Sequence, residues 1–189
     1  MSKVNQNIIT PVADFKWAFI TKSRENLSGV KQYSITLSIS KEEAAPILKA
    51  IEDVWAASGI KKPMKSAGYK TNEETGMLEF NFKTNETFAD GTKKVVSVYD
   101  AKGRKVDLGD RLIGNGSRGR VNGTVAPYES GPNAGITLYL NSIQLTKFVE
   151  YEGGDGFEAF DADPDCFTGF ELDEFESVGE QEQSPAVKF

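Results

Sequence analysis

The chain has 189 residues, of which 39% are hydrophobic and 26% charged; it contains no histidine and one cysteine. This size and composition suit one globular domain with a modest core, or a domain followed by a tail. The absence of histidine excludes imidazole acid–base catalysis and His-based zinc sites. The composition therefore favours a binding protein over an enzyme, and we expect no cofactor and no metal ion.

The sequence predicts neither a membrane-spanning helix nor a secretory signal. No segment approaches the roughly 20 apolar residues that a membrane-spanning helix needs, and the N-terminal residues lack the charged-then-apolar pattern of a secretory signal. The single cysteine, Cys166, cannot form an internal disulfide, which fits a reducing compartment. We expect a cytoplasmic protein that does not associate with membranes.

The charge is distributed unevenly along the chain. Residues 1–150 carry 21 Lys and Arg against 16 Asp and Glu, a net +5, whereas residues 151–189 carry 1 Lys against 12 Asp and Glu, a net −11. This asymmetry is typical of a body that binds a polyanion and carries an acidic tail, and equally of an ordinary domain with a solubilising tail. We predict a domain over residues 1–151 and an acidic, disordered tail over 152–189.

The first third of the chain predicts two strands and one helix. Apolar residues alternate with polar ones over 12–20 and 31–39, the period of a half-buried strand. A helix is predicted over 41–58, because Ser40 and Glu43 have the spacing of a capping box and Gly59 can end the helix. Pro46 limits where its first turn can begin, and Trp55 is expected in the core.

The remainder predicts further strands. Residues 60–75 form a basic loop, and strands are predicted over 77–83, 94–100, 116–128 and 136–151. Glycines alternate with valines on one face of the 116–128 strand, as at the corners of small barrels. In the last strand the apolar parity switches near Asn141, which predicts a bulge. About six strands with a single helix after the second predict an all-β, barrel-like fold.

Residues 114–119, GNGSRG, match the G-x-G-x-x-G spacing of dinucleotide-binding loops. That motif works where it follows a strand and opens a helix, so that the helix N-terminus meets a pyrophosphate. Here the segment leads into a predicted strand, so we assign it no cofactor.

Basic residues interleaved with aromatic ones carry the functional prediction. A single nucleic-acid strand exposes phosphates, which Lys and Arg neutralise, and base faces, on which aromatic rings stack. Trp17 suits either stacking or the core, as do its neighbours Phe15 and Phe19, whereas Phe80 and Phe82 are expected in the core. The candidate nucleic-acid-binding residues are Trp17, Lys61, Lys62, Lys65, Tyr69, Lys70, Lys93, Lys94, Arg104, Lys105, Arg118, Arg120 and Tyr128.

Four segments give the chain a family resemblance: KKPMKS (61–66), VVSVYDAKGRKV (95–106), IGNGSRGRV (113–121) and GITLYLNSIQLTKFVEY (135–151). With them the sequence resembles the single-stranded-DNA-binding proteins of tailed bacteriophages, which act in replication and recombination. The resemblance implies an OB-fold barrel that binds single-stranded DNA without sequence preference, in the cytoplasm of the infected bacterium. A helix after the second strand departs from the usual OB-fold order, so its placement tests this interpretation.

The resemblance also implies an acidic C-terminal tail that competes with DNA and contacts replication proteins. The tail residues expected to contact partners are Asp173, Glu174, Phe175, Glu176 and Phe189. The last nine residues, QEQSPAVKF, are not a solid acidic run, and the acidic bulk lies at 152–182.

Two other functions stay open from the residues themselves. One is a structural or assembly protein whose acidic tail binds a basic partner, with no nucleic-acid binding. The other is an enzyme that uses carboxylates alone, although no motif places two acids together. The sequence decides neither between DNA and RNA nor between a monomer and a homodimer.

Overall fold

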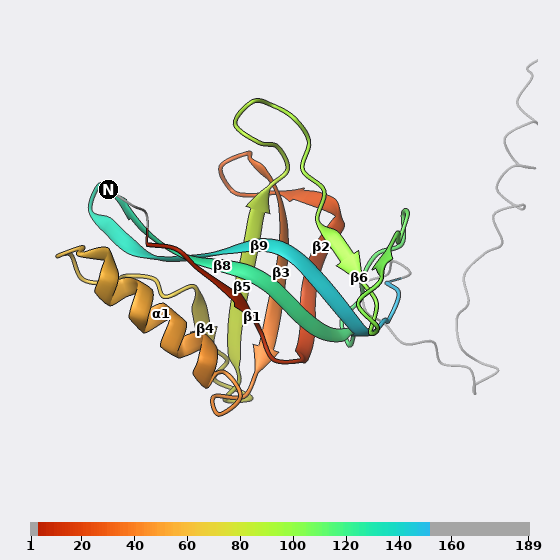
Figure 1. The fold of residues 1–189 in the computed structure, drawn as a ribbon, viewed down its shortest axis with the longest axis horizontal. Helices are drawn as coiled ribbons and strands as arrows, with labels where there is room; N and C mark the ends of the chain where they lie inside the picture. Colours follow the sequence, from red (N-terminus) through yellow and green to blue (C-terminus); the bar gives the residue numbers. More distant parts are fainter. Residues whose placement is uncertain (1–3, 152–189) are drawn as a thin grey trace, which may run out of the picture. The chain divides into compact units, whose positions relative to one another are not determined.

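The computed structural model describes residues 4–151 (Figure 1). Over that range the chain is rich in strands, with one α-helix. The elements are β1 (Gln6–Ile9), β2 (Ala13–Glu25), β3 (Lys31–Ile39), α1 (Ala45–Ser58), β4 (Tyr69–Thr71), β5 (Leu78–Asn85), β6 (Ser97–Tyr99), β7 (Lys105–Val106), β8 (Arg118–Ser130) and β9 (Asn133–Lys147). The predicted tail, with all five of its candidate residues, lies outside the described residues.

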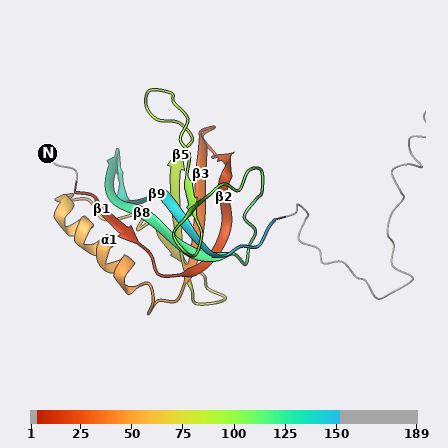
Figure 2. The same ribbon diagram turned by 45° about the vertical axis from the view of Figure 1, so that its right-hand side comes forward.

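Five strands close into a barrel. β2 pairs with β3, β3 with β5, β8 with β9 and β8 with β2, all antiparallel, and β5 pairs with β9 in parallel. The ring order is therefore β2–β3–β5–β9–β8, with the third and fifth barrel strands parallel, which is the arrangement of an OB fold. The predicted all-β, OB-fold-like class is confirmed, and Figures 1 and 2 show the strands curving around a common interior.

The interior is filled by the apolar face that each strand presents at period two. Phe15, Ile35, Leu37, Phe80 and Phe82 are each fully buried. The expected core positions of Phe80 and Phe82 are thereby confirmed.

Helix α1 lies outside the barrel, against β8 and β1 (Figure 2). It buries Ile47, Ile51 and Val54, and Trp55 packs, partly buried, against the same core. The helix connects β3 to β5, the second and third barrel strands, so the departure from the usual OB-fold order noted from the sequence is present. The connection runs outside the ring and leaves the pairing of β3 with β5 intact.

The predicted start of the helix was wrong by about one turn. The Ser40 hydroxyl accepts a hydrogen bond from the Glu43 backbone N–H at 3.3 Å and donates one to the Glu43 carboxylate at 2.9 Å. These bonds close a separate turn over residues 41–44, and the helix itself begins at Ala45, with Pro46 in its first turn. The end is as predicted, because Gly59 adopts the left-handed conformation at φ 68°.

Some strand predictions also need correction. The strand predicted over 94–100 is shorter, because only Ser97–Tyr99 pairs with β9 and Val95 is 79% exposed. The basic loop predicted over 60–75 contains a short strand, β4, which pairs with β5. The first predicted strand, over 12–20, extends to Glu25 because its second half still pairs with β3.

The bulge predicted in the last strand is confirmed. Asn122 lies opposite Ser142 and Gly123 lies opposite Leu140, so Asn141 is the extra residue. Gly123 is needed at this bend, because a Cβ there would come within 2.6 Å of the Phe82 ring. A larger residue would force the two layers of the barrel apart.

Candidate nucleic-acid interface

The outer faces of β3 and β5 form the floor of a groove. Because their apolar residues point inward, Ser34 and Thr36 of β3 and Asn81 and Lys83 of β5 face outward. Two adjoining hollows, of about 490 and about 390 Å³, share Asn81 and Lys83. Together they make one continuous depression, here called the outer groove, which runs from the β2–β3 loop toward the β8–β9 turn.

Basic side chains line the outer groove. Lys70 and Lys83 are exposed, and neither has an ion-pair partner among residues 4–151. At the end near the β2–β3 loop, the Arg24 guanidinium lies 5.3 Å from the centre of the Phe19 ring. These three cations are free to meet an external anion.

The outer groove is lined by fewer acidic side chains than basic ones. Glu79 accepts hydrogen bonds from the Asn72 side-chain amide at 3.1 Å and from the Lys16 ammonium at 3.0 Å. These bonds, Asn72 first, hold the pKa of the Glu79 carboxyl below its ordinary value. The carboxylate is therefore ionised but partly neutralised by Lys16. Glu25 is the second acid lining the groove, so cations outnumber carboxylates there.

Two tyrosines line the outer groove. Tyr69 of β4 packs against Phe80, with ring centroids 5.1 Å apart and an interplanar angle of 37°. Tyr128 of β8 lies at the end near the β8–β9 turn. Both are half-buried, and Tyr69 also packs against the hydrophobic core. Such rings suit base stacking, which is indifferent to sequence because every base has a π-face.

The predicted lysines Lys61, Lys62 and Lys65 precede the part of their loop that lines the outer groove, which begins at Ser66. The Lys62 ammonium pairs with Glu129 at 2.6 Å, and the Lys65 ammonium donates to the Asn133 side chain at 3.0 Å. Both lysines thus fasten segment 61–68 to the β8–β9 hairpin, and their charges are already engaged. Lys61 is exposed beyond the end of α1.

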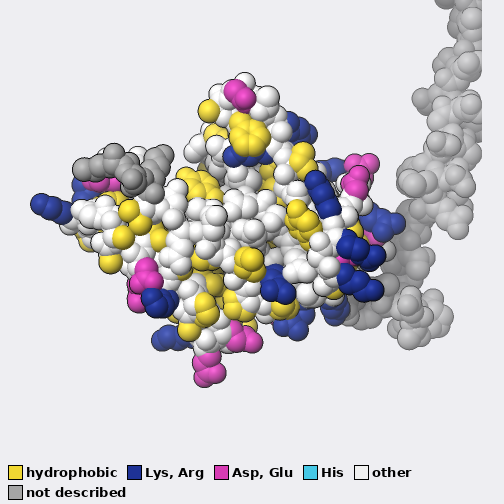
Figure 3. Space-filling view, viewed as in Figure 1, with side chains coloured by type: hydrophobic (Ala, Val, Ile, Leu, Met, Phe, Trp, Pro, Cys, Tyr) yellow, Lys and Arg dark blue, Asp and Glu magenta, His cyan; other side chains and the backbone are white. Residues whose placement is uncertain are grey.

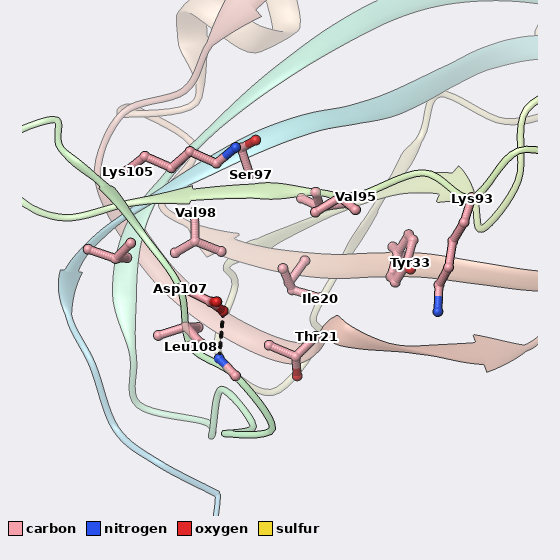
Figure 4. Close-up of a pocket in the computed structure, with 13 residues that line it drawn as sticks. Ile20, Thr21, Tyr33, Lys93, Val95, Ser97, Val98, Lys105, Asp107 and Leu108 are labelled. Atoms are coloured by element: carbon pink, nitrogen blue, oxygen red, sulfur yellow. Dashed lines mark hydrogen bonds between the residues drawn. The ribbon is translucent and has the colours of Figure 1, made fainter.

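Lys93 and Lys105 belong to a different hollow, of about 580 Å³. Figure 4 shows them at opposite ends of it, with Ile20 and Tyr33 in the apolar floor between. Tyr33 alternates with the groove residues along β3 and is buried, so this hollow opens on the other side of the sheet. The structure does not bring Lys93 and Lys105 into the outer groove.

The neighbouring Lys94 lies near this region but is already engaged. Its ammonium donates to the Thr84 hydroxyl at 3.1 Å and lies 4.9 Å from the centre of the Phe88 ring.

The predicted arginines also lie outside the outer groove. Arg104 pairs with Asp100 at 2.8 Å within a turn, and Arg118 pairs with Asp14 at 2.8 Å. Arg120 lines a small hollow of about 330 Å³ beside β1. Figure 3 shows Lys and Arg side chains gathered over the end of the barrel where β6 lies. The predicted set is therefore split over several faces, of which only one is the outer groove.

Trp17 is 63% exposed, so it is not a core residue. It lies on β2 directly after Lys16, the residue that neutralises Glu79 at the groove. Its neighbours differ, because Phe15 is fully buried and Phe19 is half-buried on the outer face opposite Ser34.

Sequence reasoning missed two cations of the outer groove, Arg24 and Lys83. Lys83 could have been predicted from the sequence, because Leu78, Phe80 and Phe82 alternate on the inward face and place Lys83 on the outward one. Arg24 was missed because the first strand was predicted to end at residue 20, whereas β2 extends to Glu25.

Residues 4–151 contain no group of three or more His, Cys, Asp or Glu side chains placed to hold a metal ion. Over the same residues, the helix is too short and too polar to cross a membrane.

The fold matches solved structures of phage proteins that bind single-stranded DNA. The bacteriophage T7 protein gp2.5, a single-stranded DNA binding protein, superposes with a TM-score of 0.65 at 20% identity, over 88% of this chain and 100% of that one. A C-terminally truncated form of the single-stranded DNA-binding protein of bacteriophage Enc34 superposes with a TM-score of 0.60 at 15% identity, over 79% of this chain and 93% of that one. The structure of the Enc34 protein in complex with single-stranded DNA superposes with a TM-score of 0.56 at 17% identity, over 78% of this chain and 89% of that one.

At these identities the similarity establishes the architecture: the chain has the fold of phage single-stranded-DNA-binding proteins. No protein-family model matches the chain, and no curated protein matches its sequence.

Proposed function

We propose that this protein binds single-stranded DNA without sequence preference and acts in phage DNA replication and recombination. The observation that carries the proposal is the outer groove of an OB-type barrel, which is lined by the cations Lys70, Lys83 and Arg24 and, in one of its two hollows, by Tyr69 and Tyr128. In OB folds, oligonucleotides usually bind to the face of the second and third barrel strands, which are β3 and β5 in this protein. The similarity in fold to the Enc34 protein, solved with single-stranded DNA, supports the same assignment.

Binding rests on two kinds of contact. The cations of the groove attract the phosphate chain, and each phosphate neutralised releases counterions, so affinity falls as salt rises. Tyr69 and Tyr128 stack on bases, at roughly 1–3 kcal/mol per base. A duplex keeps its bases stacked inside, so it gains only the phosphate term and binds more weakly.

The acidic segment regulates this site in our proposal. Residues 152–189 hold 12 Asp and Glu against 1 Lys, a charge that competes with DNA for the basic groove. When DNA occupies the groove, the released segment recruits replication proteins through Asp173, Glu174, Phe175, Glu176 and Phe189. The protein does no catalysis and works in the cytoplasm of the infected bacterium.

Fluorescence anisotropy with a labelled oligo-dT tests the proposal, using oligo-U and duplex DNA of equal length as competitors. We expect binding that weakens with salt and that duplex competes for poorly. Competition by oligo-U decides between DNA and RNA. The absence of binding at low salt would refute the proposal and favour an assembly protein.

The tail is tested in the full chain by replacing Asp173, Glu174 and Glu176 with their amides. We expect the neutralised chain to bind oligo-dT more tightly than the wild type at low salt, with the two converging at high salt. If the neutralised chain and the wild type bind oligo-dT equally well at every salt concentration, the proposal that the acidic segment competes with DNA is wrong.

A further inference from the structure

The backbone at Trp17 is an outlier. Among residues 4–151, Trp17 is the one non-glycine residue with a positive φ, at 50°. A bulky side chain in this left-handed region clashes with its own backbone, so such residues are rare. Strained conformations of this kind persist where the surrounding structure enforces them, and they gather at functional sites.

The strain arises from a β-bulge. Lys16 lies opposite Thr36 and Phe19 lies opposite Ser34, so Trp17 and Ala18 together face the single residue Ile35 of β3. In the bulge type that places its first residue in the left-handed region, that residue is ordinarily glycine. Here the position holds the largest side chain instead.

One side-chain hydrogen bond holds this backbone in place. The Trp17 N–H donates to Oδ1 of Asn115 at 3.0 Å. Two residues earlier, the Phe15 N–H donates to the Ser117 carbonyl at 2.9 Å. The Asn115 side chain therefore acts as the next hydrogen-bond acceptor for β2, after the Ser117 carbonyl that precedes β8.

The GNGS segment builds the turn that presents Asn115. The Ser117 N–H donates to the Gly114 carbonyl at 3.3 Å, and Gly116 has φ 96°. A left-handed glycine at the third position is the mark of a type II turn, with Asn115 at its exposed second position. The glycine motif that binds no cofactor thus has a structural role, which is to hold the turn beside Trp17.

The fold does not need an indole at this position. Trp17 is 63% exposed, and glycine would relieve the backbone strain. Tryptophan at a glycine position, exposed and next to the lysine that pairs with Glu79 of the groove, therefore points to a role in binding. Trp17 follows Lys16, whose ammonium reaches Glu79 in the outer groove, so the ring lies close to the proposed path of the DNA.

We infer that Trp17 is a base-stacking residue at the edge of the outer groove and that Asn115 is the positioning residue that holds it there. The inference rests on the proposed function, because the ligand is the same single strand. It adds a third stacking ring, on β2, to the two tyrosines of the groove.

Three variants of the full-length protein separate stacking from strain. Trp17→Gly removes the ring and the strain, Trp17→Ala removes the ring but keeps a strained Cβ, and Trp17→Phe keeps a ring. We expect oligo-dT affinity to fall by roughly 5- to 150-fold in the Gly and Ala variants and by much less in the Phe variant. The melting temperature of Trp17→Gly should exceed that of Trp17→Ala by about 2–8 °C.

Each outcome of this comparison decides a separate point. If the wild type binds oligo-dT and Trp17→Gly binds equally well, the stacking role is wrong and the proposed function stands. If the wild type does not bind at all, the proposed function fails first. A Trp17→Gly variant that is both less stable and weaker in binding would show a structural residue and overturn the inference.

Asn115 is tested by a double-mutant cycle. Because Asn115 acts through Trp17, Asn115→Ala should weaken oligo-dT binding in the wild-type background and leave it unchanged in the Trp17→Gly background. Quenching of tryptophan fluorescence by oligo-dT should also shrink in Asn115→Ala. Equal losses of affinity in both backgrounds would mean that Asn115 contacts DNA itself or supports the fold generally, and would overturn its positioning role.

Discussion

Removal of the two unpaired lysines of the outer groove should change how DNA affinity depends on salt. Lys70 and Lys83 have no ion-pair partner among the described residues, so each is free to neutralise one phosphate. For single strands each phosphate contact contributes about 0.7 to the slope of log affinity against log salt. The Lys70→Ala/Lys83→Ala variant should therefore lose about 1.4 from that slope. This corresponds to about 25-fold in affinity at 0.1 M salt and about fivefold at 0.3 M.

Anisotropy titrations of labelled oligo-dT over this salt range measure the change. Lys41→Ala is the matched control, because Lys41 is also exposed but lies before α1, outside the groove. We expect the control to keep the wild-type slope. If the double variant keeps the wild-type slope, or if Lys41→Ala lowers it as much, the outer groove is not the phosphate path.

Three further predictions concern stacking, packing and pH. Tyr128→Ala should weaken oligo-dT binding by roughly 1–3 kcal/mol with little change in the salt slope; an altered slope with unchanged affinity at high salt would contradict a stacking role. Gly123→Ala should destabilise the fold by roughly 1–3 kcal/mol by overpacking, because its Cβ would meet the Phe82 ring at 2.6 Å; thermal melts against Ser130→Ala, at an exposed strand end, measure this, and equal melting temperatures would refute it. Because the Glu79 pKa is lowered from 4.5, its stabilising effect is present above that pH and is lost as the pH falls through the folded-state pKa. The melting temperature of Glu79→Gln should therefore fall below that of the wild type near neutral pH and match it in acid, whereas a constant difference would count against the Asn72 and Lys16 bonds.

The strand pattern was largely predictable from the sequence. Residues 31–39 alternate so regularly that the predicted strand matches β3, and the parity switch near Asn141 predicted the bulge that the pairing shows. Period-two burial is a local property, so a single strand reveals it. The helix start was less predictable, because a capping-box sequence also forms an isolated turn when a proline follows.

The grouping of the candidate residues was not predictable in the same way. Lys93 and Lys70 look alike in the sequence, but Lys93, in the segment before β6, and Lys70, in β4, line different hollows of the barrel. Which cations share a groove depends on strand order and on the parallel pairing of β5 with β9, and these are properties of the whole chain. The conformation of Trp17 likewise depends on a bulge and on Asn115, which is 98 residues away.

The most direct test of the account is to map where a single strand contacts the protein. Oligo-dT that carries a photoreactive 5-iodouracil in place of one thymine cross-links to the aromatic rings it touches, and mass spectrometry identifies them. We expect cross-links at Tyr69, Tyr128 and Trp17, and none at Phe88 or on the surface of α1. Cross-links confined to Phe88 or α1, with the groove tyrosines unmodified, would contradict the assignment of the outer groove as the DNA site.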